Sequence, residues 1–220
     1  VLRMKVSLMQ RFLDRTKRFL AVCIVASVFA SGVRAELRID ITKGVVEPIP
    51  IAVTDIVGPA GQPTQYGANL ARLIAEDLER SGLFKSIDRK AFIQNGRDIK
   101  TLPRFGDWRV INAQALIQVR AHIVPDGRLR VEFRLWDVLA EQQMVGLAYF
   151  TNPDHWRRVA HIIADQIYKR LTGESGYFDT RIVYISESGP PTQRVKRLAI
   201  MDQDGANHQF LTDGSSLVLT

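Results

Sequence analysis

The stretch ALIQVRAHIVPDGRLRVEFRLWDV, at residues 115–138, decides the fold. Apolar and polar residues alternate before and after Pro125-Asp126-Gly127. Such alternation on both sides of a turn signal predicts an antiparallel hairpin with one buried face. The predicted buried positions are Ala115, Ile117, Val119, Ala121, Ile123, Leu129, Val131, Phe133 and Leu135. A hairpin alone is only marginally stable, so neighbouring segments must cover this apolar face.

The segments that flank the hairpin supply two helices and further strands. Residues 69–81 repeat apolar side chains at helical spacing, and Gly82 follows as a helix terminator. A second helix opens at Asn152-Pro153, a capping pair, and ends at Gly173. Short strands are predicted at 48–53, 83–87 and 144–150, and a short helix at 107–114. Residues 36–175 are therefore predicted to form an N-terminal α/β (α+β) domain with a mixed sheet and two main helices.

Two details of these segments carry expectations of their own. Pro48 and Pro50 suit a strand start or an edge strand better than a central strand, because proline cannot donate to a sheet. Glu76, Asp77 and Glu79 are expected on the solvated face of the first helix and not as catalytic acids.

The sequence changes character after a predicted linker at 173–180. Short strands are expected at 182–185, 198–201 and 209–211, separated by polar turns that include two Asp-Gly pairs. This spacing is typical of a β-propeller, so residues 176–220 are predicted to be the first blade of an incomplete propeller. One blade cannot bury its own faces, and residues 217–220 end the sequence on an apolar run. We therefore expect a C-terminally truncated fragment.

The basic excess of the chain lies mainly in its first 35 residues. The 220 residues include 30 Lys and Arg against 23 Asp and Glu, a formal net charge of +7. Residues 1–35 hold seven of the basic residues and one acidic residue, Asp14, so residues 36–220 are nearly neutral. A nucleic-acid-binding face is therefore not expected from the overall charge.

The same 35 residues have the order of a secretory signal peptide. A basic stretch through Arg18 is followed by an apolar run at 19–30, and Val33-Arg34-Ala35 precedes Glu36. A membrane anchor is disfavoured, because the run has 12 residues whereas a spanning helix needs about 20. Cleavage between Ala35 and Glu36 is expected, which leaves an exported chain with no transmembrane anchor.

The new N-terminus would be a strand-forming segment. Leu37, Ile39 and Ile41 alternate with polar residues, and Lys43-Gly44 follows. A chain end of this kind is poorly ordered unless it is tied down. It can be an edge strand of its own domain or a strand donated to the sheet of a partner. The two alternatives are compatible if the segment exchanges between the two states.

Catalytic, cofactor and metal motifs are not found. Cys23 is the single cysteine and lies in the predicted signal peptide, which excludes disulfides, thiol catalysis and Cys–zinc sites in the exported chain. His155 and His161 are six residues apart on a predicted helix, whereas a helical metal pair needs four. Asp202-x-Asp204-Gly205 differs from a calcium loop and is expected to be a turn. We predict no enzyme and no bound cofactor or metal.

Two other classes of protein remain to be weighed. A propeller-bearing exported hydrolase would need a catalytic domain beyond residue 220. A nucleic-acid module could use the basic hairpin face formed by Arg120, Arg128, Arg130 and Arg134, but this face lacks an obvious pattern of stacking aromatics. A solvated sheet face is the favoured interpretation.

Several segments resemble the TolB family in sequence and in order. They are Glu36-Leu37-Arg38-Ile39-Asp40-Ile41 with Pro48-Ile49-Pro50-Ile51, then LERSGLF at 78–84, KRLTG at 169–173, FDTRIVY at 178–184 and LAIMDQDGAN at 198–207. The resemblance implies a periplasmic, non-enzymatic component of the Tol–Pal envelope system of Gram-negative bacteria. It also implies an N-terminal α/β domain followed by a six-bladed propeller.

The resemblance further implies specific partners. The segment at about 36–47 would engage the C-terminal domain of TolA, with Glu36, Leu37, Arg38, Ile39, Asp40, Ile41, Thr42, Lys43 and Gly44 as the binding residues. The propeller would bind the lipoprotein Pal and, in some bacteria, colicins, and other outer-membrane proteins are further possible partners. These links would support outer-membrane integrity and its invagination during cell division.

Overall fold

The computed structural model describes residues 37, 47–56, 65–94 and 99–215. The chain divides into two units, residues 1–35 and 36–220, and every described residue belongs to the second. The predicted signal peptide and its cleavage point lie outside the described residues. Within the described ranges, no helix combines the length and the apolar character needed to cross a membrane.

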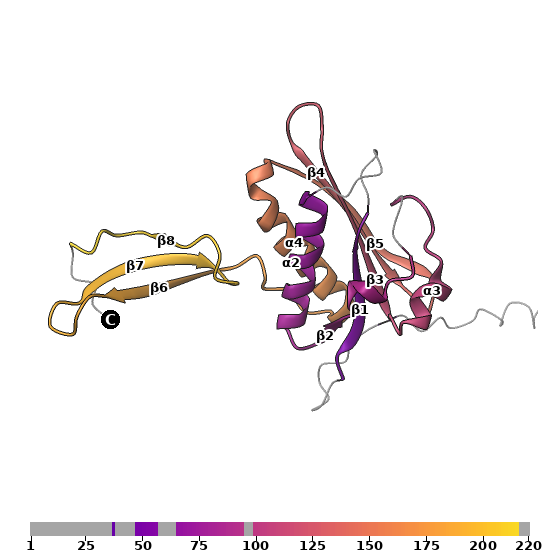
Figure 1. Cartoon of the computed structure of the whole chain (residues 1–220), viewed down its shortest axis with the longest axis horizontal. Coiled ribbons are helices and arrows are strands. Elements are labelled where there is room, and N and C mark those ends of the chain that lie inside the picture. The colour runs from indigo at the N-terminus through magenta and orange to yellow at the C-terminus, as the bar shows by residue number, and fades with distance from the viewer. Residues whose placement is uncertain (1–36, 38–46, 57–64, 95–98, 216–220) are drawn as a thin grey trace, which may run out of the picture. The chain divides into compact units, whose positions relative to one another are not determined.

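A mixed five-stranded sheet forms the centre of the domain, in the order β2-β1-β3-β4-β5 (Figure 1). Its strands are β1 (Ile49–Asp55), β2 (Phe84–Ser86), β3 (Ala115–Ile123), β4 (Leu129–Asp137) and β5 (Gln142–Thr151). β1 runs parallel to both of its neighbours, whereas β3, β4 and β5 form an antiparallel meander. The predicted mixed sheet and its central hairpin are therefore confirmed.

The burial of the hairpin differs from the alternation at both ends of β3. Ile123, predicted to be buried, is 48% exposed. Val119 and Phe133 are register partners on the face that the helices cover. Leu116 is also fully buried, although it belongs to the predicted wet face. The reason is a second apolar cluster on that side, in which Leu116 packs with Trp108 and Trp136. The expectation of a single buried face is thus wrong for the first half of β3.

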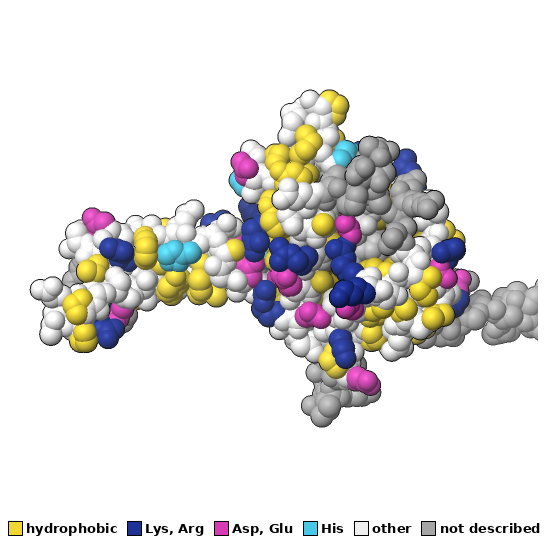
Figure 2. Space-filling view, viewed as in Figure 1, with side chains coloured by type: hydrophobic (Ala, Val, Ile, Leu, Met, Phe, Trp, Pro, Cys, Tyr) yellow, Lys and Arg dark blue, Asp and Glu magenta, His cyan; other side chains and the backbone are white. Residues whose placement is uncertain are grey.

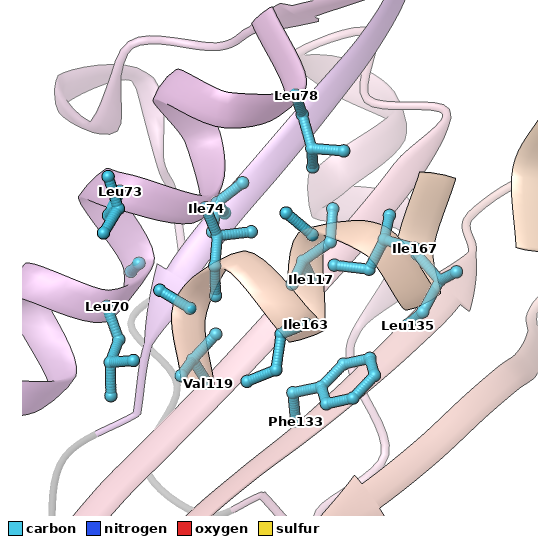
Figure 3. Close-up of a cluster of buried hydrophobic side chains, with 14 of the residues drawn as sticks. Leu70, Leu73, Ile74, Leu78, Ile117, Val119, Phe133, Leu135, Ile163 and Ile167 are labelled. Carbon is cyan, nitrogen blue, oxygen red and sulfur yellow. The ribbon is translucent and has the colours of Figure 1, made fainter. Parts of the chain in front are cut away.

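Two helices cover the other face of the sheet. They are α2 (Gln65–Arg80) and α4 (Trp156–Thr172), and they pack against each other as well as against the strands. Figure 3 shows Ile74 of α2 and Ile163 of α4 directed toward the same apolar layer as Phe133. Gly82 and Gly173 follow the helices with φ of +74° and +85°, the left-handed conformation that glycine adopts without a steric penalty. Both predicted main helices are confirmed.

The helix starts differ from the prediction in their details. α2 begins at Gln65, earlier than the predicted residue 69. Asn152 does act as an N-cap, and its side chain accepts a hydrogen bond from the Asp154 N–H at 3.1 Å. The turn that it caps is a short 3-10 helix, Pro153–His155, and the α-helix follows at Trp156. The short helix predicted at 107–114 is α3 (Phe105–Val110), so it begins and ends earlier.

The prolines of β1 mark a strand start and not a sheet edge. β1 lies between β2 and β3, so it is an internal strand. Pro48 precedes β1 and Pro50 is its second residue. The carbonyl of Pro50 accepts the Gln114 N–H at 2.9 Å, so the residue still takes part in the sheet through the group that proline retains. Of the two predicted alternatives, the strand start is the one found.

A second, three-stranded antiparallel sheet follows, in the order β6-β7-β8. Its strands are β6 (Arg181–Ser188), β7 (Val195–Asp202) and β8 (Gln209–Phe210). β6 and β7 contain the predicted segments 182–185 and 198–201, and β8 covers the predicted segment 209–211 except for its last residue. The predicted turn at 202–205 is also present, with Gly205 at φ +86°. Large apolar side chains remain exposed on this sheet, among them Ile182, Val183, Phe210 and Leu211.

Candidate functional site

The N-terminal segment is attached to the domain through Leu37. The Leu37 backbone N–H donates to Asp137 Oδ2 at 3.0 Å, across 100 residues of sequence. The side chain of Leu37 packs against the main core. The other carboxylate oxygen of Asp137 accepts the N–H groups of Leu139 and Ala140 at 2.9 and 2.8 Å. One buried carboxylate therefore accepts hydrogen bonds from both the β4–β5 turn and Leu37.

The remaining predicted site residues lie outside the described residues. They are Ala35 and Glu36 at the predicted cleavage point, and Arg38, Ile39, Asp40, Ile41, Thr42, Lys43 and Gly44 in the predicted TolA-binding segment. Leu37 is thus the one predicted binding residue that the structure places.

A buried polar cluster joins α2 to α4. Asp77 is fully buried, and its Oδ2 lies 2.6 Å from His161 Nδ1. Asp77 Oδ1 accepts hydrogen bonds from Arg80 at 3.1 Å and from Gln203 at 3.2 Å. The expectation that Asp77 lies on the solvated face of its helix is wrong. Its spacing gave a signal, because residue 77 stands three and seven residues after Ile74 and Leu70 and so belongs to the apolar stripe.

The cluster continues into the turn between β7 and β8. Asp204 pairs with Arg157, and its Oδ2 lies 3.8 Å from His161 Nε2. Asp202 ends β7, and its Oδ2 accepts a hydrogen bond from Asn207 at 2.5 Å. Residues from two helices and from the second sheet therefore meet in one place. We call this group the polar junction; its members are Asp77, Arg157, His161, Asp202, Gln203 and Asp204. A cavity of about 460 Å³ adjoins it, lined in part by Arg157, His161, Asp202 and Asn207.

Opposing effects set the ionisation of the polar junction. Burial alone would lower the pKa of His161. The hydrogen bond with Asp77 and the charges of Asp77 and Asp204 outweigh burial and raise it. Burial would raise the pKa of Asp204, but the Ala206 N–H and the charge of Arg157 lower it below its ordinary value. Neighbouring charges and hydrogen bonds therefore outweigh the effect of burial on the pKa of both His161 and Asp204.

The predicted linker at 173–180 is fastened to α4. Asp165 accepts the Phe178 N–H at 2.8 Å and the Asp179 N–H at 3.1 Å. The Phe178 ring is fully buried and packs edge-on against Tyr168. The predicted linker is therefore anchored to the helix near its C-terminal end. The composition of the segment does not predict this anchor, because the carboxylate lies on a helix 13 residues earlier.

The basic hairpin face is partly neutralised within the chain. Glu132 accepts hydrogen bonds from Arg120 and from Arg130, the latter at 2.7 Å. Arg128 pairs with Asp126 at 2.7 Å. These pairings set two carboxylates against the four arginines of the face, so they offset part of its positive charge.

The helix side of the domain also mixes charges, because Lys and Arg side chains lie beside Asp and Glu side chains over α2 and α4 (Figure 2).

Comparisons with known proteins show which family this part of the chain resembles. Residues 37–144 match the TolB amino-terminal domain family. These residues belong to that family. The chain is 57% identical over 201 residues to the Tol-Pal system protein TolB of Paramagnetospirillum magneticum, and the match covers 91% of the chain and 45% of the relative. The chain therefore spans less than half the length of that relative.

A solved structure supports the same assignment. The crystal structure of TolB from Acinetobacter baumannii matches with a TM-score of 0.63 and 25% identity. The match covers 80% of the chain and 41% of the crystallised protein. It therefore covers more of the chain than residues 37–144, which are fewer than half of the 220 residues.

Proposed function

We propose that the chain is the periplasmic adaptor of a Tol–Pal system. In this role it links the C-terminal domain of TolA, at the inner membrane, to the lipoprotein Pal at the outer membrane. The supporting observation is the 57% identity with a protein named as a component of that system. Such a link would support outer-membrane integrity and its invagination during division, and it requires no catalytic group.

The TolA-binding element in this proposal is Glu36–Gly44. Its alternating apolar residues suit strand addition, in which backbone hydrogen bonds give affinity and alternate side chains give specificity. The observation that carries the proposal is the hydrogen bond from Leu37 to Asp137. This contact holds Leu37 on its own domain and supports a docked state of the segment start. TolA would have to compete with that docked state.

Competition between two states provides a route for regulation. A ligand shifts a two-state equilibrium only through its different affinity for the two states. Pal bound to the propeller could therefore change TolA affinity if it favours the docked or the released segment, and the coupling would be reciprocal. We propose that a β-propeller is present in the whole protein and that β6, β7 and β8 form its first blade.

Two variants test the binding element in opposite directions. Deletion of residues 36–43 should abolish binding of the TolA C-terminal domain in calorimetry. Asp137→Asn keeps an oxygen for the β4–β5 turn but replaces the acceptor of the Leu37 N–H with a donor. It should release the segment and tighten TolA binding, because less free energy is needed to leave the docked state. Unchanged TolA affinity after the deletion would refute the assignment.

The hydrolase alternative gains no support from these relatives. Neither of the two similar proteins is named as an enzyme. The alternative would be revived by an esterase or peptidase activity in the exported protein that copurifies with it and disappears on deletion of its gene.

A further inference from the structure

The polar junction contains a histidine nitrogen that the family assignment does not explain. His161 is almost completely buried, yet its Nε2 has no hydrogen-bond partner among the described residues. A buried polar atom without a partner carries a desolvation cost, so native structures seldom keep one without a reason. The nearest candidate, Asp204 Oδ2, is 3.8 Å away, beyond hydrogen-bonding range.

The other nitrogen of the ring fixes the direction of this lone pair. His161 Nδ1 lies 2.6 Å from Asp77 Oδ2, so Nδ1 carries the proton and donates it to the carboxylate. In the neutral ring, Nε2 is then an acceptor. A carboxylate on one nitrogen and a free lone pair on the other is the arrangement of metal-binding histidines. Asp77 is itself held by Arg80 and Gln203, as an orienting group should be.

Two carboxylates lie beside that lone pair. Ligand atoms of His161, Asp202 and Asp204 all fall within 4.8 Å of one another. Two ligands of one tetrahedral ion with bonds of about 2.0–2.2 Å stand about 3.3–3.6 Å apart. The cluster would therefore need to contract by only about 1 Å to hold an ion.

The ligand set and its surroundings select the kind of ion. One imidazole nitrogen and two carboxylates suit Zn²⁺, which also accepts three protein ligands and a water in open sites. The cavity beside the junction provides an entry path and room for that water. Calcium fits less well, because it takes six to eight oxygen ligands.

The charges of the junction allow a divalent ion but do not all favour it. Asp77, Asp202 and Asp204 contribute three carboxylates. Arg157 pairs with Asp204, Arg80 pairs with Asp77, and Arg181 Nε lies 3.7 Å from Asp202 Oδ1. The guanidinium of Arg157 repels a cation beside it, so its removal should favour the metal. This sign distinguishes a metal site from a purely ionic contact, which the same change would weaken.

We propose that His161, Asp202 and Asp204 form a Zn²⁺ site that joins α4 to the β7–β8 turn. The site is independent of TolA binding, because its ligands lie outside residues 36–47. A bound ion would fasten the second sheet to the helical layer, since one ligand comes from the helix and two come from the turn.

Calorimetry with ZnCl₂ on the untagged, chelator-treated protein tests the proposal. We expect one ion bound per chain in the wild type. His161→Gln and Asp202→Asn should each abolish binding, whereas the matched controls His208→Gln and Asp213→Asn should leave it unchanged. Asp77→Asn should weaken binding about 10–100-fold, the usual effect of losing a carboxylate that orients a ligand histidine. Circular dichroism of each variant would verify that it is folded.

Arg157→Gln provides the sharpest arm, because it should tighten Zn²⁺ binding while the other changes weaken it. Two results would overturn the proposal. One is Zn²⁺ binding that His161→Gln and Asp202→Asn leave intact, which would indicate adventitious surface sites. The other is an ionic contact only: no ion bound by the wild type or by Arg157→Gln, although Asp204→Asn still lowers the thermal midpoint.

Discussion

The apolar core beneath α2 and α4 and the centre of the polar junction, Asp77 and His161, are both buried, but they are held together in different ways. Ile74 and Ile163 are fully excluded from solvent, and so is Asp77. The core is stabilised by many weak contacts that have no preferred direction. The junction depends on a few directional hydrogen bonds. If one partner is lost, the other stays buried and unpaired, and its desolvation then costs free energy. Burial alone therefore does not say how a region will respond to change.

The core should show the largest single loss. Phe133→Ala removes a side chain that is 1% exposed and lies between the helices and Tyr149. We expect a loss of about 3–5 kcal/mol in the free energy of unfolding, measured by urea denaturation. The control Leu147→Ala lies on the neighbouring strand, where Leu147 is 43% exposed, and should change stability by less than about 0.5 kcal/mol. Equal losses in the two variants would contradict the assigned core.

The junction should respond to one change and recover with a second. Asp77→Leu strands His161 without its partner and should cost about 3 kcal/mol, as in other broken buried pairs. Asp77→Leu with His161→Phe removes both polar partners, so the double variant should be more stable than the single one. Glu76→Leu, at an exposed neighbouring position, is the control. A double variant that merely adds two losses would show that the pair is not coupled.

The anchored segment after α4 should respond less strongly than either the core or the junction. Asp165→Ala leaves the N–H groups of Phe178 and Asp179 without their acceptor. We expect a loss of about 1–3 kcal/mol and faster amide exchange at Phe178. Asp154→Ala, which alters an exposed carboxylate before α4, should leave that exchange rate unchanged. Slow exchange at Phe178 in the Asp165 variant would mean that ring burial alone fixes the segment.

The sheet face opposite the helices should show the smallest effect, and it should depend on pH. Burial would raise the pKa of Glu132, but Arg120 and Arg130 outweigh it and lower the pKa below the ordinary 4.5. A carboxyl with a lowered folded-state pKa stabilises the protein above its unfolded pKa and loses that contribution as pH falls. Wild type should therefore exceed Glu132→Gln in stability at pH 7. The difference should narrow below about pH 4.5, as measured by denaturation at several pH values. A constant difference would rule out ionisation as its cause.

Most of the fold was predictable because its signals are local and periodic. The hairpin, both main helices and the three strands of the second sheet followed from alternation, helical spacing and turn residues. The polar junction was not predicted, because its members stand at 77, 157, 161 and 202–204 and meet only after folding. Asp77 was assigned to solvent on chemical grounds, although its spacing placed it on the buried stripe. The hydrogen bonds from residues 178 and 179 to Asp165 were not predictable either, because these groups are separated in sequence and meet only after folding.

The attachment of Phe178 and Asp179 to Asp165 also has a mechanical meaning. Only Thr180 separates this attachment from the start of β6. A pull on the chain beyond β6 would thus meet almost no slack before it reached α4. The load would enter the domain through one carboxylate and one buried ring, and α4 would pass it to the sheet. Tension from the C-terminal side is in this way delivered to the helical layer first, ahead of the strand edges and the docked Leu37.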